Sequence, residues 1–365
     1  MKKGKGAVIT AAVVGGLVEV FALNVFASPL IVKIIFAHRF SDVASMSRTS
    51  IGKYRKSLSD YDLFSYSVKE YSVASSGETL SMSLYQGENA KGLLLLTHGA
   101  ASSMEGEEAS LTDFFLGKGW AVAALDLTAS GRSSGSGIGG LDQGAEDVYH
   151  ASAALFRDSS LSEELKNRFC LAGFSWGAYS VCASLNYGFD YSPKTVCSFS
   201  GFDRPDEVAV KTASRYIGFL AKLNQPFLAG GLLMNRGVDG VLSAIDGLNQ
   251  SPSSHVVLVQ GDADPIVDDS CSIYARRNKV KEQERVSSYL VSGADHVSVW
   301  YDRYSQTYLA KQAAKDYQDL QSFRDLDEVY QSGLAQIKEN ASKRNEELLE
   351  SVESVMSLSL EQKGQ

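Results

Sequence analysis

A Gly-Phe-Ser-Trp-Gly pentapeptide, residues 173–177, lies between a short apolar run, 169–172, and a run compatible with a helix, 178–185. A strand that turns directly into a helix holds the central residue in a strained backbone conformation, with its side chain projecting from the turn. Small residues are then needed two positions away on either side, and both are glycine here. Ser175 is therefore the candidate nucleophile.

The same Gly-x-Ser-x-Gly pattern occurs a second time, at residues 131–135, with Ser133 at its centre. Further glycines follow at once, within residues 137–140, and a helix does not readily begin in so glycine-rich a stretch. Short patterns of this kind also match by chance. We therefore interpret Ser133 as a loop residue.

His296 is the candidate base for Ser175. A serine hydroxyl is a weak nucleophile at neutral pH, so it needs a positioned base, which an acid must in turn orient. In a parallel α/β sheet, functional residues follow the carboxyl ends of the strands. His296 directly follows the apolar run 286–291, whereas His150 lies in a predicted helix and His255 begins a predicted strand.

Asp264 is the candidate acid. The apolar strand 255–260 ends in Gly-Asp-Ala-Asp-Pro-Ile-Val, residues 261–267, a turn that presents a carboxylate just past the strand. Asp262 and Asp268 compete for the role, and an aspartate in such a turn can also serve only as a local cap. Spacing within the loop favours Asp264, with Asp262 as the reserve.

Ala100 and Trp176 are the candidate oxyanion-binding residues. A tetrahedral intermediate needs fixed N–H donors, each of which lowers the barrier by about 3 to 4 kcal/mol. The backbone N–H of Trp176 lies at the predicted helix N-terminus. The second donor is expected from the loop after strand 92–97, which reads His-Gly-Ala-Ala. Ala100 is the expected donor there, with His98 shaping the turn.

The full set of motifs resembles the α/β-hydrolase-fold serine hydrolases, in the branch that includes monoacylglycerol-lipase-like and serine-aminopeptidase-like enzymes. The resemblance covers roughly residues 65–318 and follows that family's chain order, Ser then Asp then His. The triple-glycine oxyanion loop of many lipases is absent, which argues against that lipase type. Similar bacterial enzymes are often anchored at the membrane. The matching segments are 98–99, 126–135, 173–177, 261–267 and 293–296.

The apolar pattern predicts an α/β fold. Two early strands, about 66–73 and 80–85, form a predicted hairpin. Short apolar strands then alternate with helical segments, which predicts a mostly parallel sheet with helices on both faces, the α/β-hydrolase fold that the resemblance implies. Residues 201–254 hold no convincing strand and are predicted to form a helical cap insertion. The later strands are 92–97, 119–127, 169–172, 195–199, 255–260 and 286–291.

Composition is that of an ordinary globular protein. The net charge of −8 leaves no basic stripe for phosphate backbones, so nucleic-acid binding has no electrostatic support. The four cysteines have no metal-ligand spacing. We expect buried free thiols, with a disulfide between Cys170 and Cys197 as the alternative. No metal or organic cofactor is implied.

The N-terminal segment, residues 1–40, predicts a membrane anchor. Three lysines precede an apolar stretch of 27 residues, 6–32, interrupted only by Glu19 and Asn24. A membrane span needs about 20 apolar residues. An uncleaved single-pass anchor in the cell membrane, with the rest of the chain outside the cytoplasm, is the first interpretation. A cleavable signal peptide ending near Ala27 and a buried helix of a soluble protein are the alternatives.

Three further regions complete the predicted domain organisation. Residues 41–62 are polar and are predicted to form a stalk or short surface helix, and the hydrolase domain with its cap spans 63–320. Residues 321–365 are predicted to form a charged C-terminal helix whose apolar positions, such as Leu334 and Ile337, share one face. That face packs against the domain or contacts a partner helix.

The sequence thus predicts a membrane-anchored enzyme that cleaves small-molecule carboxylic esters through an acyl-enzyme intermediate. Amide cleavage, as in aminopeptidases of the same fold, is the alternative enzyme activity. In that case Asp203, Asp206 or Glu207 could bind the amine of the substrate. A non-catalytic binding module with this fold is the alternative from another functional class.

Overall fold

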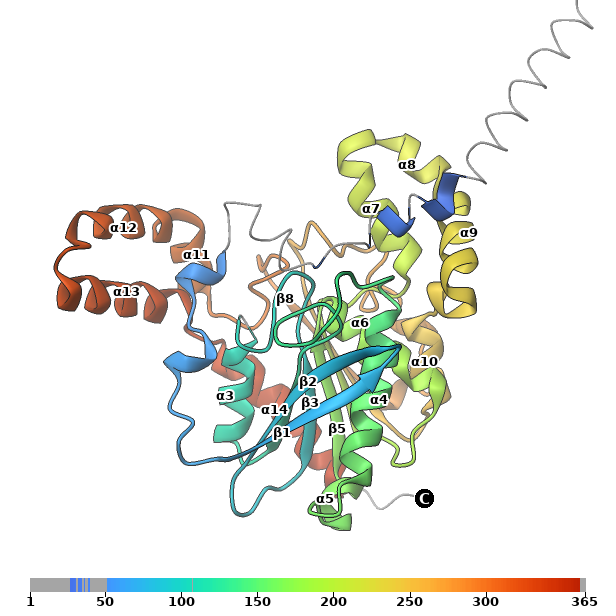
Figure 1. The fold of residues 1–365 in the computed structure, drawn as a ribbon, viewed down its shortest axis with the longest axis horizontal. Helices are drawn as coiled ribbons and strands as arrows, with labels where there is room; N and C mark the ends of the chain where they lie inside the picture. The colour runs from blue at the N-terminus through green and yellow to red at the C-terminus, as the bar shows by residue number, and fades with distance from the viewer. Residues whose placement is uncertain are drawn as a thin grey trace, which may run out of the picture.

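Within the described part of the chain, an eight-stranded sheet forms the centre of the structure (Figure 1). The structure is a computed structural model that describes residues 27–30, 32–34, 36, 39, 51–106 and 108–361. The strand order is β1-β2-β4-β3-β5-β6-β7-β8; β2 is antiparallel to both of its neighbours, and every other pair is parallel. The predicted mostly parallel sheet is confirmed. The strands are β1 (Ser67–Ser75), β2 (Glu78–Gln86), β3 (Leu93–Thr97), β4 (Ala121–Leu125), β5 (Phe169–Phe174), β6 (Thr195–Phe199), β7 (His255–Gly261) and β8 (Val286–Val291).

The central strands are continuously apolar because both faces of the sheet are covered. In β3, Leu93 and Leu95 belong to one core cluster, Leu94 and Leu96 belong to another, and all four are fully buried. Side chains alternate between the two faces along a strand, so no position of such a strand reaches water. The first face is covered by α4 (Gln143–Arg157), α6 (Trp176–Ala183) and α10 (Ala244–Gln250), and the second by α3 (Ala109–Gly117) and α14 (Glu346–Glu361).

The four cysteines are free thiols buried in the fold, as the sequence predicts. Burial raises the pKa of Cys170 to about 12 and that of Cys271 to about 11. Burial also raises the pKa of Cys182 and Cys197 above the usual range. All four therefore remain protonated and unreactive at neutral pH. Cys170 and Cys197 do not form the disulfide that was the alternative.

The insertion between β6 and β7, here called the cap, is helical. Pro205 begins its first helix, where a missing N–H costs nothing. Gly218 and Gly237, with φ of 59° and 64°, end successive helices and turn the chain, because glycine adopts positive φ without strain. The cap consists of α7 (Pro205–Ile217), α8 (Phe219–Leu223), α9 (Gln225–Arg236), the 3-10 turn η4 (Gly237–Val241) and α10.

The C-terminal region forms two helices where the sequence analysis expected one. The chain turns between α13 (Asp327–Ala341) and α14, where the side chain of Asn345 accepts a hydrogen bond from the N–H of Leu348. α14 buries its apolar face, including Leu349, Val352 and Met356, against the sheet. α13 instead packs with α11 (Arg303–Lys311) and α12 (Ala313–Leu320) around a small separate core.

The N-terminal region contacts the domain wherever the structure describes it. Residues 27–30 and 32–34 are helical and lie beside α9 (Figure 1). In the segment predicted as a stalk, Arg55 is buried, so the described part of this segment, residues 51–62, packs on the domain rather than projecting from it. Most of the predicted anchor, 6–26, lies outside the described residues. In the described portion of the chain, no helix has the length and apolarity that crossing a membrane requires.

Candidate active site

Ser175 occupies the turn between β5 and α6. Its backbone has φ 53° and ψ −110°, a conformation that residues with a side chain rarely adopt. Its N–H donates a 2.8 Å hydrogen bond to the carbonyl oxygen of Phe199 at the end of β6, and its own carbonyl accepts from the N–H of Tyr179. α6 begins at Trp176. The strand, the strained turn and the helix therefore follow one another as the pentapeptide predicts.

Gly173 and Gly177 allow the surrounding backbone to approach this turn. A Cβ on Gly173 would lie 2.4 Å from the backbone of Gly177, and a Cβ on Gly177 would lie 2.6 Å from the carbonyl oxygen of His98. Gly99 has the same role on the other side, since its Cβ would lie 2.7 Å from the ring of Phe174. The absence of these side chains brings the loop after β3 against Ser175.

Ser175, His296 and Asp264 form one line of hydrogen bonds. The Oγ of Ser175 lies 2.8 Å from Nε2 of His296, and Nδ1 of His296 lies 2.7 Å from Oδ2 of Asp264. All three residues are buried. Because the carboxylate can only accept, Nδ1 carries the imidazole proton and Nε2 is left to accept the proton of the serine hydroxyl.

Asp264 is held so that it faces His296. Its Oδ1 accepts hydrogen bonds from the N–H groups of Ile266 and Val267 at 2.8 and 2.9 Å, and its Oδ2 accepts from the side-chain amide of Gln260 at 3.0 Å. The reserve candidate, Asp262, is turned away and its side chain accepts from the N–H of Gly293. The remaining candidate, Asp268, pairs with Lys211.

Three features of the backbone together define the architecture. The sheet is parallel from β4 through β8 with an antiparallel β2, a strained serine follows β5, and the acid and the histidine follow β7 and β8. The chain has the α/β-hydrolase fold. The α/β-hydrolase fold places each of these side chains just beyond the carboxyl end of a strand, which is why residues far apart in sequence meet here.

Among known proteins, solved structures are similar to this chain, whereas family models and curated sequences are not. No protein-family model and no curated protein matches the chain. An esterase of Pyrococcus furiosus is 20% identical over 65% of this chain and 85% of its own, with a TM-score of 0.47. An acylaminoacyl peptidase of Pyrococcus horikoshii is 16% identical over 65% of this chain and 39% of its own, with a TM-score of 0.48. A membrane phospholipase A, a bacterial virulence factor, is 16% identical over 90% of this chain and 99% of its own, with a TM-score of 0.43. These values are low, so the strand order and the serine turn, rather than the neighbours, define the fold.

The loop after β3 carries the predicted oxyanion residue Ala100, which is exposed beside Gly99. His98 ties this loop to the one after β4. Its Nε2 accepts a hydrogen bond from the N–H of Leu127 at 3.1 Å, so Nδ1 carries the proton and donates to the carbonyl of Gly99 at 2.7 Å. Burial lowers the pKa of His98, which keeps the ring neutral. His98 thus shapes the turn, as the sequence predicts. The other predicted donor, the N–H of Trp176, lies in the first residue of α6.

Glu108 also holds this loop in place through hydrogen bonds, a role that was not predicted from sequence. Its carboxylate is fully buried and accepts hydrogen bonds from the N–H of Gly99 and the hydroxyl of Ser102, each at 2.8 Å. These bonds fix the residues on both sides of Ala100. In sequence, Glu108 is one acidic residue at the start of a predicted helix, and no local pattern marks its role.

Replacing Glu108 by alanine is expected to lower kcat for hydrolysis about tenfold to a hundredfold, with a small change in KM. The substitution leaves the buried N–H of Gly99 without its acceptor, and a small displacement of an oxyanion donor is costly. Glu108→Gln retains an acceptor and is expected to recover most of the rate. Steady-state kinetics with p-nitrophenyl acetate measure the effect.

Glu105→Ala is the matched control, because this exposed acidic side chain lies in the same loop and its described ion pair with Arg132 is a surface contact. We expect its kcat to equal that of the wild type. An unchanged kcat in Glu108→Ala would show that Glu108 does not position the loop.

The loop that carries His296 is held by aromatic rings and by a buried arginine. Phe174 packs against the imidazole with ring centroids 5.1 Å apart, and Trp300 packs edge-on against Phe174 at 5.0 Å. The guanidinium of Arg55 donates to the carbonyl of Val297 at 2.6 Å and stacks over Tyr301. Arg55 comes from the segment predicted as a stalk, so its partner lies 242 residues away and the sequence offers no signal for it.

The three acidic residues considered for amine binding are paired with arginines. Arg276 contacts Asp203 at 2.7 Å and Glu207 at 2.6 Å, and Arg204 contacts Asp206 at 3.1 Å. Asp203 also accepts a hydrogen bond from the hydroxyl of Ser243. Each of the three carboxylates therefore already contacts an arginine, which disfavours a role in binding a substrate amine.

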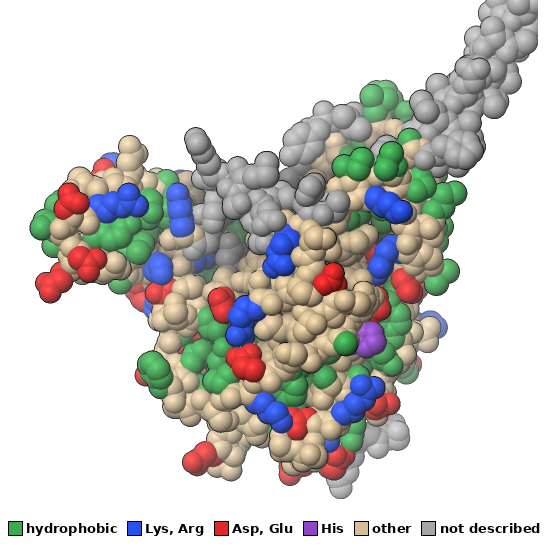
Figure 2. Space-filling view, viewed as in Figure 1, with side chains coloured by type: hydrophobic (Ala, Val, Ile, Leu, Met, Phe, Trp, Pro, Cys, Tyr) green, Lys and Arg blue, Asp and Glu red, His purple; other side chains and the backbone are tan. Residues whose placement is uncertain are grey.

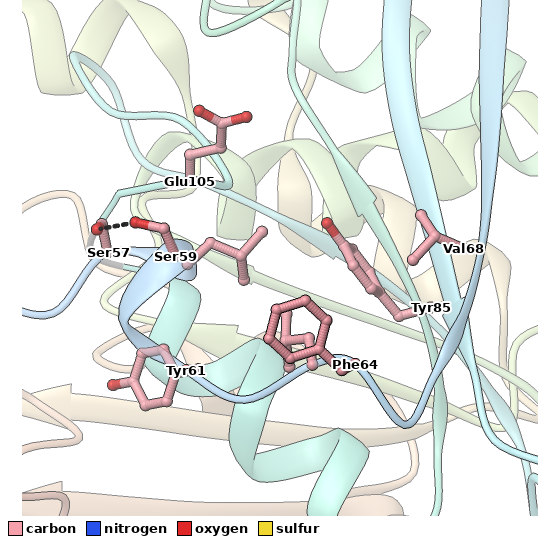
Figure 3. A pocket seen from close by; sticks show the side chains of 9 residues that line it. Ser57, Ser59, Tyr61, Phe64, Val68, Tyr85 and Glu105 are labelled. Atoms are coloured by element: carbon pink, nitrogen blue, oxygen red, sulfur yellow. Dashed lines mark hydrogen bonds between the residues drawn. The ribbon is translucent and has the colours of Figure 1, made fainter.

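Two further features, the Ser133 loop and a surface groove, do not involve Ser175, His296 or Asp264. Ser133 lies in a loop, as predicted, and its buried hydroxyl donates to the carbonyl of Asp126. A groove of about 620 Å³ lies between the 57–64 segment and strands β1 and β2, with Phe64 and Tyr85 on its wall (Figure 3). Its lining includes none of the triad residues, so we do not assign it to substrate.

Proposed function

We propose that this chain is a serine hydrolase that cleaves carboxylic esters through an acyl-enzyme. The observation that carries the proposal is the line of two hydrogen bonds from Ser175 through His296 to Asp264, built on a strained turn at the N-terminus of a helix. Such a line is the arrangement that activates a serine hydroxyl at neutral pH.

Acylation follows from these contacts. The Oγ of Ser175 attacks the ester carbonyl while Nε2 of His296 takes the hydroxyl proton, and Asp264 stabilises the resulting imidazolium. The C–O bond to the alcohol then breaks, and the leaving oxygen receives that proton from His296. In deacylation, water gives a proton to His296 and attacks the acyl carbon. The bond between the acyl carbon and Oγ of Ser175 then breaks, Oγ takes the proton from His296, and the acid is released. The N–H groups of Ala100 and Trp176 stabilise the oxyanion in both steps.

A two-panel assay tests ester cleavage against amide cleavage. We expect p-nitrophenyl esters to be hydrolysed and aminoacyl p-nitroanilides to remain intact, because the cap carboxylates are paired with Arg276 and Arg204. Increasing the acyl chain length across the ester panel locates the preferred substrate. Faster anilide cleavage would favour the peptidase alternative, and inactivity in both panels would favour the binding module.

We also propose that the chain is held at the cell membrane by residues 6–26, with the hydrolase domain outside the cytoplasm. The apolar length of this segment supports the proposal. Association of the full chain with lipid vesicles tests it.

A further inference from the structure

The outer helices of the cap expose large apolar side chains. Six such residues on α8, α9 and the turn after α9 are between 43% and 76% exposed. Figure 2 shows hydrophobic side chains gathered over this part of the molecule. A contiguous apolar surface of this kind marks an interaction site rather than ordinary scatter. The six residues, here called the outer cap face, are Phe219, Leu220, Leu223, Leu233, Met234 and Val238.

The charge of the same segment is opposite to that of the whole chain. Residues 208–238 contain Lys211, Arg215, Lys222 and Arg236 but no acidic residue, although the chain carries a net charge of −8. Among these, the side chain of Lys222 is exposed next to Leu223. Lys211 forms an ion pair with Asp268, and Arg236 forms one with Asp142, so Lys222 is the basic side chain described as exposed at this face. An apolar face with an exposed lysine beside it matches a lipid surface that contains anionic headgroups.

The N-terminal segment reaches the described structure beside this face. A Cβ on Gly231 would lie 2.9 Å from the backbone of Ser28, so glycine lets residues 27–30 and 32–34 lie directly on α9. The side-chain amide of Asn235 donates to the carbonyl of Pro29 at 2.8 Å. Leu30 and Ile34 of this segment are themselves 61% and 58% exposed, so they extend the outer cap face.

The length of the apolar sequence before this contact matches a bilayer. Residues 6–26 comprise 21 residues, and about 20 helical residues cross the roughly 30 Å hydrocarbon core. A span of that length would end at Ala27, where the chain is already fixed on α9. A span ending there would place the outer cap face at the membrane surface, because no linker separates the end of the span from the contact with α9.

We propose that the outer cap face is a membrane-docking surface, which rests in the interfacial region of a bilayer containing anionic phospholipid. This inference goes beyond ester hydrolysis, since docking requires no turnover. It also fixes the orientation of the domain: α8 and α9 lie against lipid, and α14 lies on a distant part of the domain (Figure 1).

Site-directed fluorescence in the full chain tests the docking. Leu223→Cys and Met234→Cys, each in the Ser175→Ala background, are labelled with an NBD fluorophore and reconstituted in vesicles of phosphatidylcholine and phosphatidylglycerol. The four native cysteines are buried with raised pKa values, so the introduced thiol reacts alone. We expect a blue shift and about twofold quenching by nitroxide-labelled lipid at both positions, as burial in the interface requires.

Leu358→Cys on α14 is the matched control, because Leu358 is 60% exposed and Leu223 is 62% exposed. We expect no lipid quenching there. Equal and negligible quenching at all three positions would overturn the proposal, as would a full chain that does not associate with vesicles. Shielding of positions 223 and 234 from aqueous iodide without lipid quenching would also overturn it, and would instead indicate cover by a second copy or by the N-terminal segment. Since the protein carries Ser175→Ala, failure of the ester-hydrolysis proposal leaves this result unaffected.

Discussion

Ser175→Ala is expected to lower kcat for ester hydrolysis by about 10⁴-fold to 10⁶-fold and to abolish labelling by a fluorophosphonate probe. The substitution removes the only atom that can form the acyl-enzyme, whereas His296, Asp264 and the oxyanion loop remain in place. Residual hydrolysis then depends on water activated by His296. Folding should be retained, because alanine fits the space of the serine and the described bonds of the turn to Phe199 and Tyr179 come from the backbone.

The second Gly-x-Ser-x-Gly segment provides a control inside the same chain. The buried hydroxyl of Ser133 donates to the carbonyl of Asp126 and accepts from the N–H of Ser81 in β2. Ser133→Ala should therefore lower stability by about 1 to 3 kcal/mol, while probe labelling and kcat stay close to wild type. Burst kinetics with p-nitrophenyl acetate and gel detection of the probe give two independent readouts. If Ser175→Ala labels as strongly as wild type, Ser175 is not the nucleophile and the proposed enzyme activity fails.

The residues that meet at Ser175 could be predicted from sequence because each follows a parallel strand. β5 and β7, which precede Ser175 and Asp264, are buried and read as continuous apolar runs, so their carboxyl ends can be placed within a residue or two. β8, which precedes His296, is partly exposed and contains two serines, so its apolar pattern is weaker. A nucleophile, an acid and a base at the ends of three parallel strands must share one edge of the sheet. Strand placement alone thus brings the candidates together.

Distinguishing Asp264 from Asp262 needed the structure. Both lie in the turn after β7, and composition does not separate them. Hydrogen bonds from the N–H groups of Ile266 and Val267 turn Asp264 toward His296, and the N–H of Gly293 holds Asp262 elsewhere. The positions of these N–H donors depend on the conformation of the loop, and a loop has no sequence periodicity from which its conformation could be predicted.

Supporting residues escaped prediction for a related reason: their partners are remote. Arg55 and Val297 are 242 residues apart, and the carboxylate of Glu108 acts on Gly99 through the folding of a loop. The division of the C-terminal region also depends on tertiary contacts, since α14 packs on the sheet while α13 joins a separate core. The helical pattern of the sequence is present in both segments, and only the packing shows that they separate.

Gly177→Ala is expected to destabilise the fold by about 3 kcal/mol, near the upper end for overpacking a core, and to reduce activity as well. The new Cβ would lie 2.5 Å from Oγ1 of Thr97 and 2.6 Å from the carbonyl oxygen of His98. The second of these is backbone, which cannot rotate away as a side chain can. The first turn of α6 must then move away from the end of β3, and the loop that carries Ala100 moves with it.

Gly117→Ala on α3 isolates this steric effect from the general effect of replacing glycine. No atom lies within 4 Å of a Cβ at Gly117, so alanine there should be neutral or stabilising by up to about 1 kcal/mol. Chemical denaturation of both variants measures the two free energies of unfolding, and p-nitrophenyl acetate hydrolysis measures the activity that remains. A Gly177→Ala protein as stable as Gly117→Ala would mean that α6 does not press against the loop after β3. In that case, steric contact with the loop after β3 would not explain why residue 177 is a glycine. The close approach of this loop to Ser175 would then not depend on Gly177.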